Sequence, residues 1–246
     1  TQLCNLSESS FVAKPTHPDA VFSGRIFTRV REMPFAGHPT LGTCRAWLNA
    51  GGVPKNEGVI IQECGAGLVE IRCDANDPDR LAFKAPPLIK EGEVSPEHLG
   101  KIIKLLQMEP SDIVAASWAD NGPGWVALRL ESAQAVLAVE PLRYSHERLD
   151  IGLVGPHPSG APTAFELRAL FTDHNGMVIE DPVTGSLNAS VAQWLKATGV
   201  VETGYTAAQG TRIGRSGRIA IDYEGSDTWV GGRVRSMFAG SGAPWS

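Results

Sequence analysis

Apolar residues recur at helical spacing in three stretches of the 246-residue chain. The spacing i, i+3, i+4 predicts helices that start near Pro39, at Pro96 and near Ser186. Their apolar faces are, in chain order, Cys44, Trp47 and Leu48; Leu99, Ile102, Ile103 and Leu106; and Leu187, Val191, Trp194 and Leu195. Ser95 is the expected N-cap of the middle helix. Glycines at 51–52 and 199 are expected to end the other two.

Short apolar segments, several of them alternating with polar residues, predict strands in the rest of the chain. The predicted strands cover 25–28, 59–61, 68–73, 81–84, 113–116, 125–130, 136–139, 168–172, 219–223 and 234–238. The glycine pair at 231–232 is expected to be a turn before the last of them. These elements indicate an α+β protein in which strands outnumber helices.

The second half of the chain repeats the first. Arg25 and Arg168 lie 143 positions apart, and each opens a strand that ends in Phe-Thr. Pro39 and Pro182 are also 143 positions apart, and each begins the sequence Pro-x-x-Gly-[Ser/Thr]. The similarity between the halves continues at Gln62 and Gln209. After each glutamine comes a glycine, Gly67 or Gly217, that opens a predicted strand. We therefore predict two homologous halves, residues 1–110 and 111–246.

The repeat is incomplete at its beginning. The strands predicted between 113 and 139 have no counterpart in the first half, which starts at Thr1. We expect that roughly 30 to 35 residues, about two strands and a connection, precede Thr1 in a longer protein. Without them, one edge strand of the first half would have no neighbour.

Composition and charge exclude several classes of partner. The formal net charge is −5 and no basic cluster is present, so nucleic acid is not an expected partner. No apolar run reaches the length of a membrane span. The four cysteines form no CxxC pair and are expected to be reduced thiols of a cytoplasmic protein. No histidine spacing suggests a metal, and no phosphate-binding glycine motif suggests a nucleotide, so neither metal nor cofactor is expected.

Two helix starts are candidate anion sites. Residues 180–186 read Glu-Asp-Pro-Val-Thr-Gly-Ser and lead into the third predicted helix, and residues 38–43 read His-Pro-Thr-Leu-Gly-Thr within the first. The first N–H groups of a helix lack intrahelical partners, and the helix dipole favours negative charge there. We expect a small ligand that carries a carboxylate.

Four motifs resemble the phenazine biosynthesis PhzF-like isomerase family over nearly the whole chain. They are Asn5-Leu6-Ser7-Glu8, the segment from Phe35 to Gly42, the segment from Glu180 to Ser186, and Gln209-Gly210 through Gly217. The resemblance implies a diaminopimelate epimerase-like fold, in which each half wraps strands around a central helix and the ligand lies between the two helix starts. It also implies a homodimer.

The resemblance assigns roles to six residues of this sequence. Glu8 matches the catalytic acid and base, whereas His38 and Asp181 match polar groups that flank the substrate. Gly37, Gly185 and Ser186 match substrate contacts. Gly37 and Asp181 stand where related epimerases carry paired cysteines, so a two-thiol mechanism is not expected. The implied reaction is proton transfer by a carboxyl group, without metal or cofactor.

Alternatives remain open at each position. Glu8 is by itself an ordinary exposed carboxylate; it suits acid–base work if an apolar pocket, for which Phe11 and Val12 are candidates, raises its pKa. His38 is a potential capping residue, although its predicted position matches that of Asp181 in the repeat. Asp181 and Ser186 are potential helix caps. If these residues have only such ordinary roles, the chain is a binding or interaction protein on this fold. A less favoured alternative is a serine hydrolase that uses Ser186, His38 and Asp181.

Overall fold

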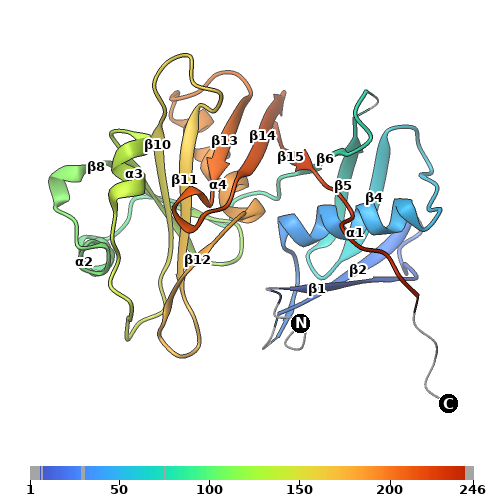
Figure 1. Cartoon of the computed structure of the whole chain (residues 1–246), viewed down its shortest axis with the longest axis horizontal. Coiled ribbons are helices and arrows are strands. Elements are labelled where there is room, and N and C mark those ends of the chain that lie inside the picture. The colour runs from blue at the N-terminus through green and yellow to red at the C-terminus, as the bar shows by residue number, and fades with distance from the viewer. Residues whose placement is uncertain (1–5, 7, 29–30, 75, 242–246) are drawn as a thin grey trace. The chain divides into compact units, whose positions relative to one another are not determined.

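A computed structural model describes residues 6, 8–28, 31–74 and 76–241. The chain divides into two compact units (Figure 1). Unit 1 comprises Thr1–Phe83 and Gly231–Ser246, and unit 2 comprises Lys84–Val230. The chain therefore passes from unit 1 to unit 2 after Phe83 and returns after Val230.

Unit 1 places one helix, α1 (Gly37–Asn49), against a sheet. Its strands lie in the order β1-β2-β4-β5-β6, and β3 pairs with β2. Their bounds are β1 Ser9–Ala13, β2 Phe22–Phe27, β3 Glu32–Met33, β4 Val59–Cys64, β5 Gly67–Cys73 and β6 Arg80–Lys84. The Trp47 ring stacks on Phe22 at 5.2 Å between centroids, which anchors α1 to β2.

Unit 2 is built on a longer sheet with the strand order β15-β14-β13-β11-β10-β9-β8-β7, and β12 pairs with β11. The strands are β7 Lys90–Gly92, β8 Ile113–Asp120, β9 Trp125–Leu130, β10 Asp150–Pro156, β11 Phe165–Thr172, β12 Val178–Asp181, β13 Tyr205–Gln209, β14 Gly217–Glu224 and β15 Asp227–Arg233. The helices are α2 Pro96–Leu106, α3 Ala133–Ala138 and α4 Gly185–Ala197, with short 3₁₀ turns at Pro110–Asp112 and Thr211–Ile213.

Helices cover both faces of the unit 2 sheet, and two glycines of β10 show how closely they pack. A Cβ atom on Gly152 would lie 2.3 Å from Leu187 of α4, whereas one on Gly155 would lie 2.3 Å from the Ser132 carbonyl oxygen, where α3 begins. Because side chains alternate across a strand, these glycines face opposite sides. Helix α2 shares the α3 side, where Ile102, Leu105 and Leu106 join the core.

The two units repeat the same elements, but not with one constant offset. Strands β2 and β11 correspond at 143 positions, so Arg25 matches Arg168 as predicted. Helices α1 and α4, each 13 residues long, begin at Gly37 and Gly185, which are 148 positions apart. The connection before α4 is therefore five residues longer. Pro39 is the third residue of α1, whereas Pro182 precedes α4, so the predicted equivalence of the two Pro-x-x-Gly motifs is wrong.

Two predicted strands are corrected. Residues 136–139 were expected to be a strand, but most of this segment belongs to helix α3, because the Ser132 hydroxyl caps the helix by accepting a hydrogen bond from the Ala135 N–H at 3.1 Å. The pair Gly231-Gly232 lies inside β15 and is not a turn. A Cβ atom on Gly231 would lie 2.5 Å from the Leu81 carbonyl oxygen, so glycine permits this close backbone approach. Residues 234–238 follow β15 as irregular chain.

The boundaries of the compact units, after Phe83 and after Val230, differ from the boundary at residue 110 between the predicted halves 1–110 and 111–246. Helix α2 belongs to unit 2 because its apolar face completes that core. The end of β15 returns to unit 1, where the Val234 N–H donates to the Asp79 carbonyl at 2.8 Å. In unit 1, β1 pairs with β2 alone among the described residues, whereas its counterpart β10 lies between β9 and β11.

Candidate functional site

Helices α1 and α4 begin without a side-chain cap. The N-cap residues are Ala36 and Thr184, and neither side chain accepts a hydrogen bond from the first turn. Neither first turn contains an acidic residue. The other two α-helices of the described chain have serine caps, at Ser95 and Ser132. The two repeated helices thus keep their positive ends available for an anion.

The start of α4 is held by a buried amide, Gln209 at the end of β13. Its Oε1 accepts from the Thr184 N–H at 3.0 Å and from Asn188 Nδ2 at 2.8 Å. Its Nε2 donates to the Asp181 carbonyl and to Thr184 Oγ1, both at 2.9 Å. All four hydrogen-bonding positions of this amide are used, so the approach to α4 is fixed without blocking the N–H groups of Gly185 and Ser186.

Asp181 ends β12 and contacts Thr184, the residue before the helix. Its Oδ2 accepts a hydrogen bond from Thr184 Oγ1 at 2.5 Å. The prediction that Asp181 and Ser186 act as caps is wrong, because Thr184 occupies the N-cap and Ser186 is already the second helical residue. Asp181, Gly185 and Ser186 are thus brought together at one helix start through Thr184.

Ser186 is bound to a neighbouring aromatic residue. Trp125 Nε1 donates to Ser186 Oγ at 3.1 Å, and Asn121 Nδ2 donates to the Ser186 carbonyl at 2.9 Å. Within the described part of unit 2, no histidine is hydrogen-bonded to the Ser186 hydroxyl. A serine nucleophile needs a base that takes its proton, and the described histidines of unit 2 do not supply one.

Glu8, Gly37 and His38 belong to unit 1. Glu8 is half-buried immediately before β1, the strand that packs against α1. Phe11 and Val12 are 57% and 47% exposed, so these two side chains do not form the enclosed apolar pocket for which they were candidates. Asn5 and Ser7 of the same motif lie outside the described residues.

Gly37 is the buried first residue of α1, and His38 is its exposed second residue. The 148-residue offset makes His38 the counterpart of Ser186, and Met33 that of Asp181. The predicted equivalence of His38 and Asp181 is therefore wrong.

Sequence reasoning missed one buried ion pair. Arg168 of β11 is 2% exposed and its Nη2 lies 2.8 Å from Glu180 Oε2, on β12 just before Asp181. Its Nη1 also donates to the carbonyls of Val136 and Val139 at 3.1 and 2.6 Å. The repeat had marked Arg168 as a landmark, but its burial could not be inferred from the sequence.

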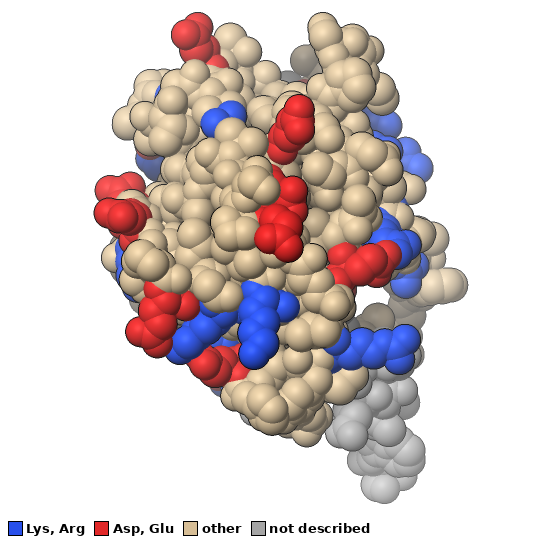
Figure 2. Space-filling model, turned by 90° about the vertical axis from the view of Figure 1, so that its left-hand side faces the viewer, with Lys and Arg blue, Asp and Glu red and all other residues tan. Residues whose placement is uncertain are grey.

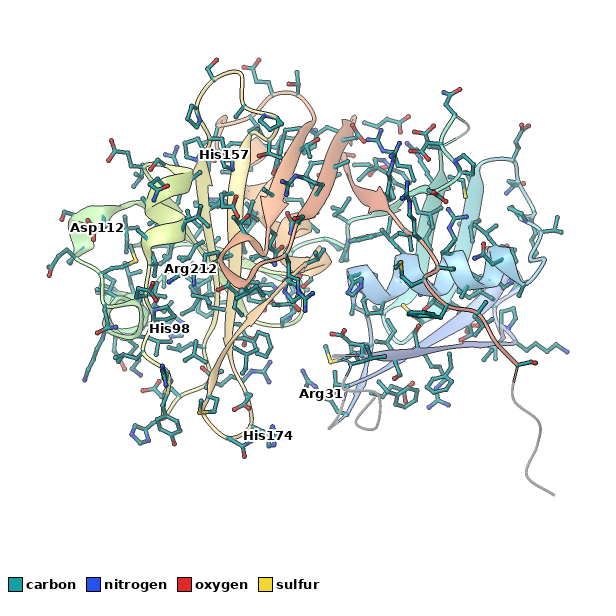
Figure 3. All side chains as sticks on the ribbon, viewed as in Figure 1. Arg31, His98, Asp112, His157, His174 and Arg212 are labelled. Carbon is teal, nitrogen blue, oxygen red and sulfur yellow. The ribbon has the colours of Figure 1, made fainter. Side chains whose placement is uncertain are left out.

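Other kinds of site find little support in the described residues. No group of three or more His, Cys, Asp or Glu side chains there is arranged to hold a metal. His98, His157 and His174 lie far apart in unit 2 (Figure 3). On the face in Figure 2, acidic and basic residues are interspersed, with no continuous basic patch. Among the described helices, none is long and apolar enough to span a membrane.

The described cysteines are free thiols, and Cys4 lies outside the described residues. Cys44 is the eighth residue of α1 and is fully buried, so it does not lie at the helix start. Burial, with a smaller contribution from Cys73, raises the pKa of the Cys44 thiol to about 12. A neutral, enclosed thiol is a poor acid–base group at neutral pH, which fits the expectation that no two-thiol mechanism operates.

Comparison with known proteins gives consistent matches along the chain. The family model described as phenazine biosynthesis-like protein matches residues 1–240. A trans-2,3-dihydro-3-hydroxyanthranilate isomerase of Pseudomonas aeruginosa is 31% identical over 250 residues, which cover 98% of this chain and 83% of the relative. Antisense-enhancing sequence 1 of Schizosaccharomyces pombe is 30% identical over 96% of this chain and 84% of its own length.

Among solved structures, a PhzF-family phenazine biosynthesis protein of Bacillus anthracis aligns with a TM-score of 0.75 at 17% identity. The alignment covers 94% of this chain and 83% of that one. At this identity the likeness concerns the fold alone. It confirms the predicted α+β class with a diaminopimelate epimerase-like fold of two similar halves.

Proposed function

Because this chain belongs to the phenazine biosynthesis-like protein family, we propose that it is an isomerase that moves a proton within a small carboxylate-bearing metabolite. Glu8 is the proposed acid and base. Its carboxylate takes a proton from one carbon of the substrate, the electron pair of that C–H bond shifts a double bond, and the carboxylic acid returns the proton to another carbon. The reaction is redox-neutral and needs no co-reactant.

The observation that carries this proposal is the uncapped start of α4. The N–H groups of Gly185 and Ser186 have no side-chain partner among the described residues, and Gln209 holds the preceding turn in place. An uncapped start costs about 1 kcal/mol of helix stability relative to a Ser or Asp cap. A bound carboxylate would supply the missing acceptors, and this supports recognition of an anionic substrate.

His38 and Asp181 are the proposed polar contacts of the substrate. His38 is exposed on the first turn of α1, so its imidazole is accessible to a ligand and to a proton. Asp181 already accepts a hydrogen bond from Thr184, which fixes the orientation of its carboxylate toward a hydroxyl or amino group of the substrate.

Deuterium incorporation tests the reaction. The protein is incubated in D₂O with trans-2,3-dihydro-3-hydroxyanthranilate, the substrate in a relative's name, and with a panel of unsaturated or hydroxylated carboxylic acids. We expect one compound to gain deuterium at carbon, and Glu8→Gln to slow incorporation by about a thousandfold. The control Glu57→Gln removes an exposed carboxylate of the same unit and should leave the rate unchanged.

The competing function is a binding protein that performs no reaction on the same fold. It predicts saturable binding of a carboxylate, weakened by substitutions at the start of α4, without deuterium incorporation in any compound of the panel. If Glu8→Gln incorporated deuterium at the full rate, the protein would still be an isomerase, but Glu8 would not be its acid and base.

A further inference from the structure

Unit 2 contains a cavity of about 610 Å³ at the C-terminal end of α4, the end away from Ser186. Its α4 side is formed by Trp194, Ala197 and Thr198, and its other wall by strands β7 to β9. The volume lies within the range of about 300 to 1,000 Å³ that is typical of small-molecule sites. None of the residues assigned a role in catalysis or substrate binding lines it.

An arginine in the wall of this cavity has no partner for its guanidinium among the described residues. Arg129 lies on β9 among buried neighbours, and no hydrogen bond or ion pair joins its guanidinium to any described residue. Trp125, four residues earlier on the same strand, points to α4, because its indole donates to Ser186. Residues four apart on a strand share a face, so Arg129 points to α4 as well.

Two glutamates complete the charges of the cavity. Glu91 lies opposite Ala119 in the sheet, and Glu93 comes directly after the end of β7. Both line the cavity, and neither is ion-paired with Arg129 or with any other described residue. Strand β8, which lies between β7 and β9, contributes Ala115, Ala116, Ser117 and Trp118 to the lining, and none of these residues carries a charge. Positive and negative groups therefore face the same space without neutralising each other.

The rest of the lining is largely apolar. Leu88, Trp194, Ala197 and Val200 contribute side chains to it. A simple anion would be repelled by the two glutamates, and a simple cation by the arginine. A ligand that carries both charges and an apolar body meets all three requirements, since a guanidinium binds a carboxylate through two parallel hydrogen bonds.

We propose that this cavity binds the zwitterion of an α-amino acid with an apolar side chain. Arg129 holds the carboxylate, Glu91 and Glu93 face the ammonium group, and the side chain packs on Trp194. This site is separate from the proposed isomerase site and does not depend on it.

The tryptophans at the two ends of α4 report which site a ligand occupies. Trp194 lines the cavity, and the Trp125 indole is hydrogen-bonded to Ser186 at the helix start. In the full chain labelled with ¹⁵N at the indoles, L-leucine should cause a saturable shift of the Trp194 signal, assigned with Trp194→Phe, and little change at Trp125. Absence of a Trp194 shift, or a shift of Trp125 alone, overturns the proposal.

Matched ligands and variants test the charges. Isocaproate lacks the amino group of leucine and isoamylamine lacks its carboxylate; each should bind at least about tenfold more weakly than leucine. Arg129→Gln and Glu93→Gln should weaken leucine binding to a similar extent, whereas Arg129→Lys should retain part of it. The control Arg218→Gln alters an exposed strand arginine outside the cavity. Equal affinity for leucine and isocaproate, or unchanged binding in both Gln variants, would refute a zwitterion site.

Discussion

At the residue scale, the same ion pair occurs in both units with opposite exposure. Arg25 and Glu32 join β2 to β3 at 2.7 Å, and Arg168 and Glu180 join β11 to β12 at 2.8 Å. The side chains of the first pair are 56% and 43% exposed, and those of the second 3% and 8%. Water screens the first pair, whereas the second pair depends on its own geometry and on the carbonyls that Arg168 also binds.

We predict that Arg168→Met lowers the free energy of unfolding by about 3 to 5 kcal/mol, because Glu180 would remain buried without its cation. Arg25→Met, its counterpart in the repeat, should cause no resolvable change. Urea unfolding followed by far-UV circular dichroism measures both. This account would be contradicted if Arg168→Met lowered the free energy of unfolding only slightly and the double variant Arg168→Met/Glu180→Leu were no more stable than Arg168→Met.

The raised pKa of Cys44 predicts low thiol reactivity. A shift from 9.0 to about 12 leaves about a thousandfold less thiolate at pH 8 than in an unperturbed thiol. The pKa of Cys44 is higher in the folded protein than in the unfolded chain, so the fold favours the neutral thiol. As the pH rises above 9, the thiol ionises in the unfolded chain first, and the folded protein therefore becomes less stable. Iodoacetamide and peptide mass mapping should find Cys44 unmodified in the folded protein and alkylated in urea. Alkylation in the folded protein at the rate of Cys64 would contradict it.

At the scale of elements, the two helix starts are held with unequal strength. Gln209 makes four hydrogen bonds around α4. Gln62 contacts Thr40 in α1 at 3.5 Å, and its buried Oε1 has no hydrogen-bond partner in the described part of the chain. We predict that Gln209→Leu costs about 2 to 3 kcal/mol, because the Thr184 N–H loses its acceptor. Gln62→Leu should be close to neutral. Equal losses in the two variants, measured by urea unfolding, would show that the amides have equivalent roles.

The sequence predicted those elements whose signals are local. The cap at Ser95 and the apolar spacing behind it placed α2 correctly, and the alternation at 125–130 placed β9 with its bounds. Helix α3 was mistaken for a strand because six residues are too few for helical periodicity to show. Strands β10 and β13 were not predicted, since β10 is almost entirely buried and therefore does not alternate.

The sequence placed residues on the two helix starts, but it did not predict the geometry around them. Gly37, Gly185 and Ser186 lie in the first turns of α1 and α4, as the motifs predicted, and their roles stay predictions. The position of His38 relative to Asp181 was wrong, because the connection before α4 is five residues longer than its counterpart and one offset was assumed throughout. The missing caps, the four bonds of Gln209 and the unpaired Arg129 depend on tertiary contacts and have no sequence signal.

At the scale of the whole molecule, the sequence repeat and the compact units divide the chain at different residues. The predicted halves, 1–110 and 111–246, leave residues 84–110 and the helix predicted from Pro96 in the first half. Packing assigns them to unit 2, where Leu105 accepts a hydrogen bond from the Leu142 N–H at 2.8 Å and Gln107 Nε2 donates to the Glu140 carbonyl at 2.8 Å. The boundary therefore follows the core and not the duplication.

This difference predicts how fragments behave. Residues 84–230 retain α2, whereas residues 111–246 lose the buried side chains Ile102, Leu105 and Leu106. Each contributes about 1.5 to 3 kcal/mol when buried, and their combined loss is comparable with the whole stability of a domain. We expect the 84–230 fragment to show dispersed amide NMR signals and cooperative urea unfolding, and the 111–246 fragment to show neither. Cooperative unfolding of 111–246 at the same urea midpoint would establish the repeat half, and not the compact unit, as the part that folds by itself.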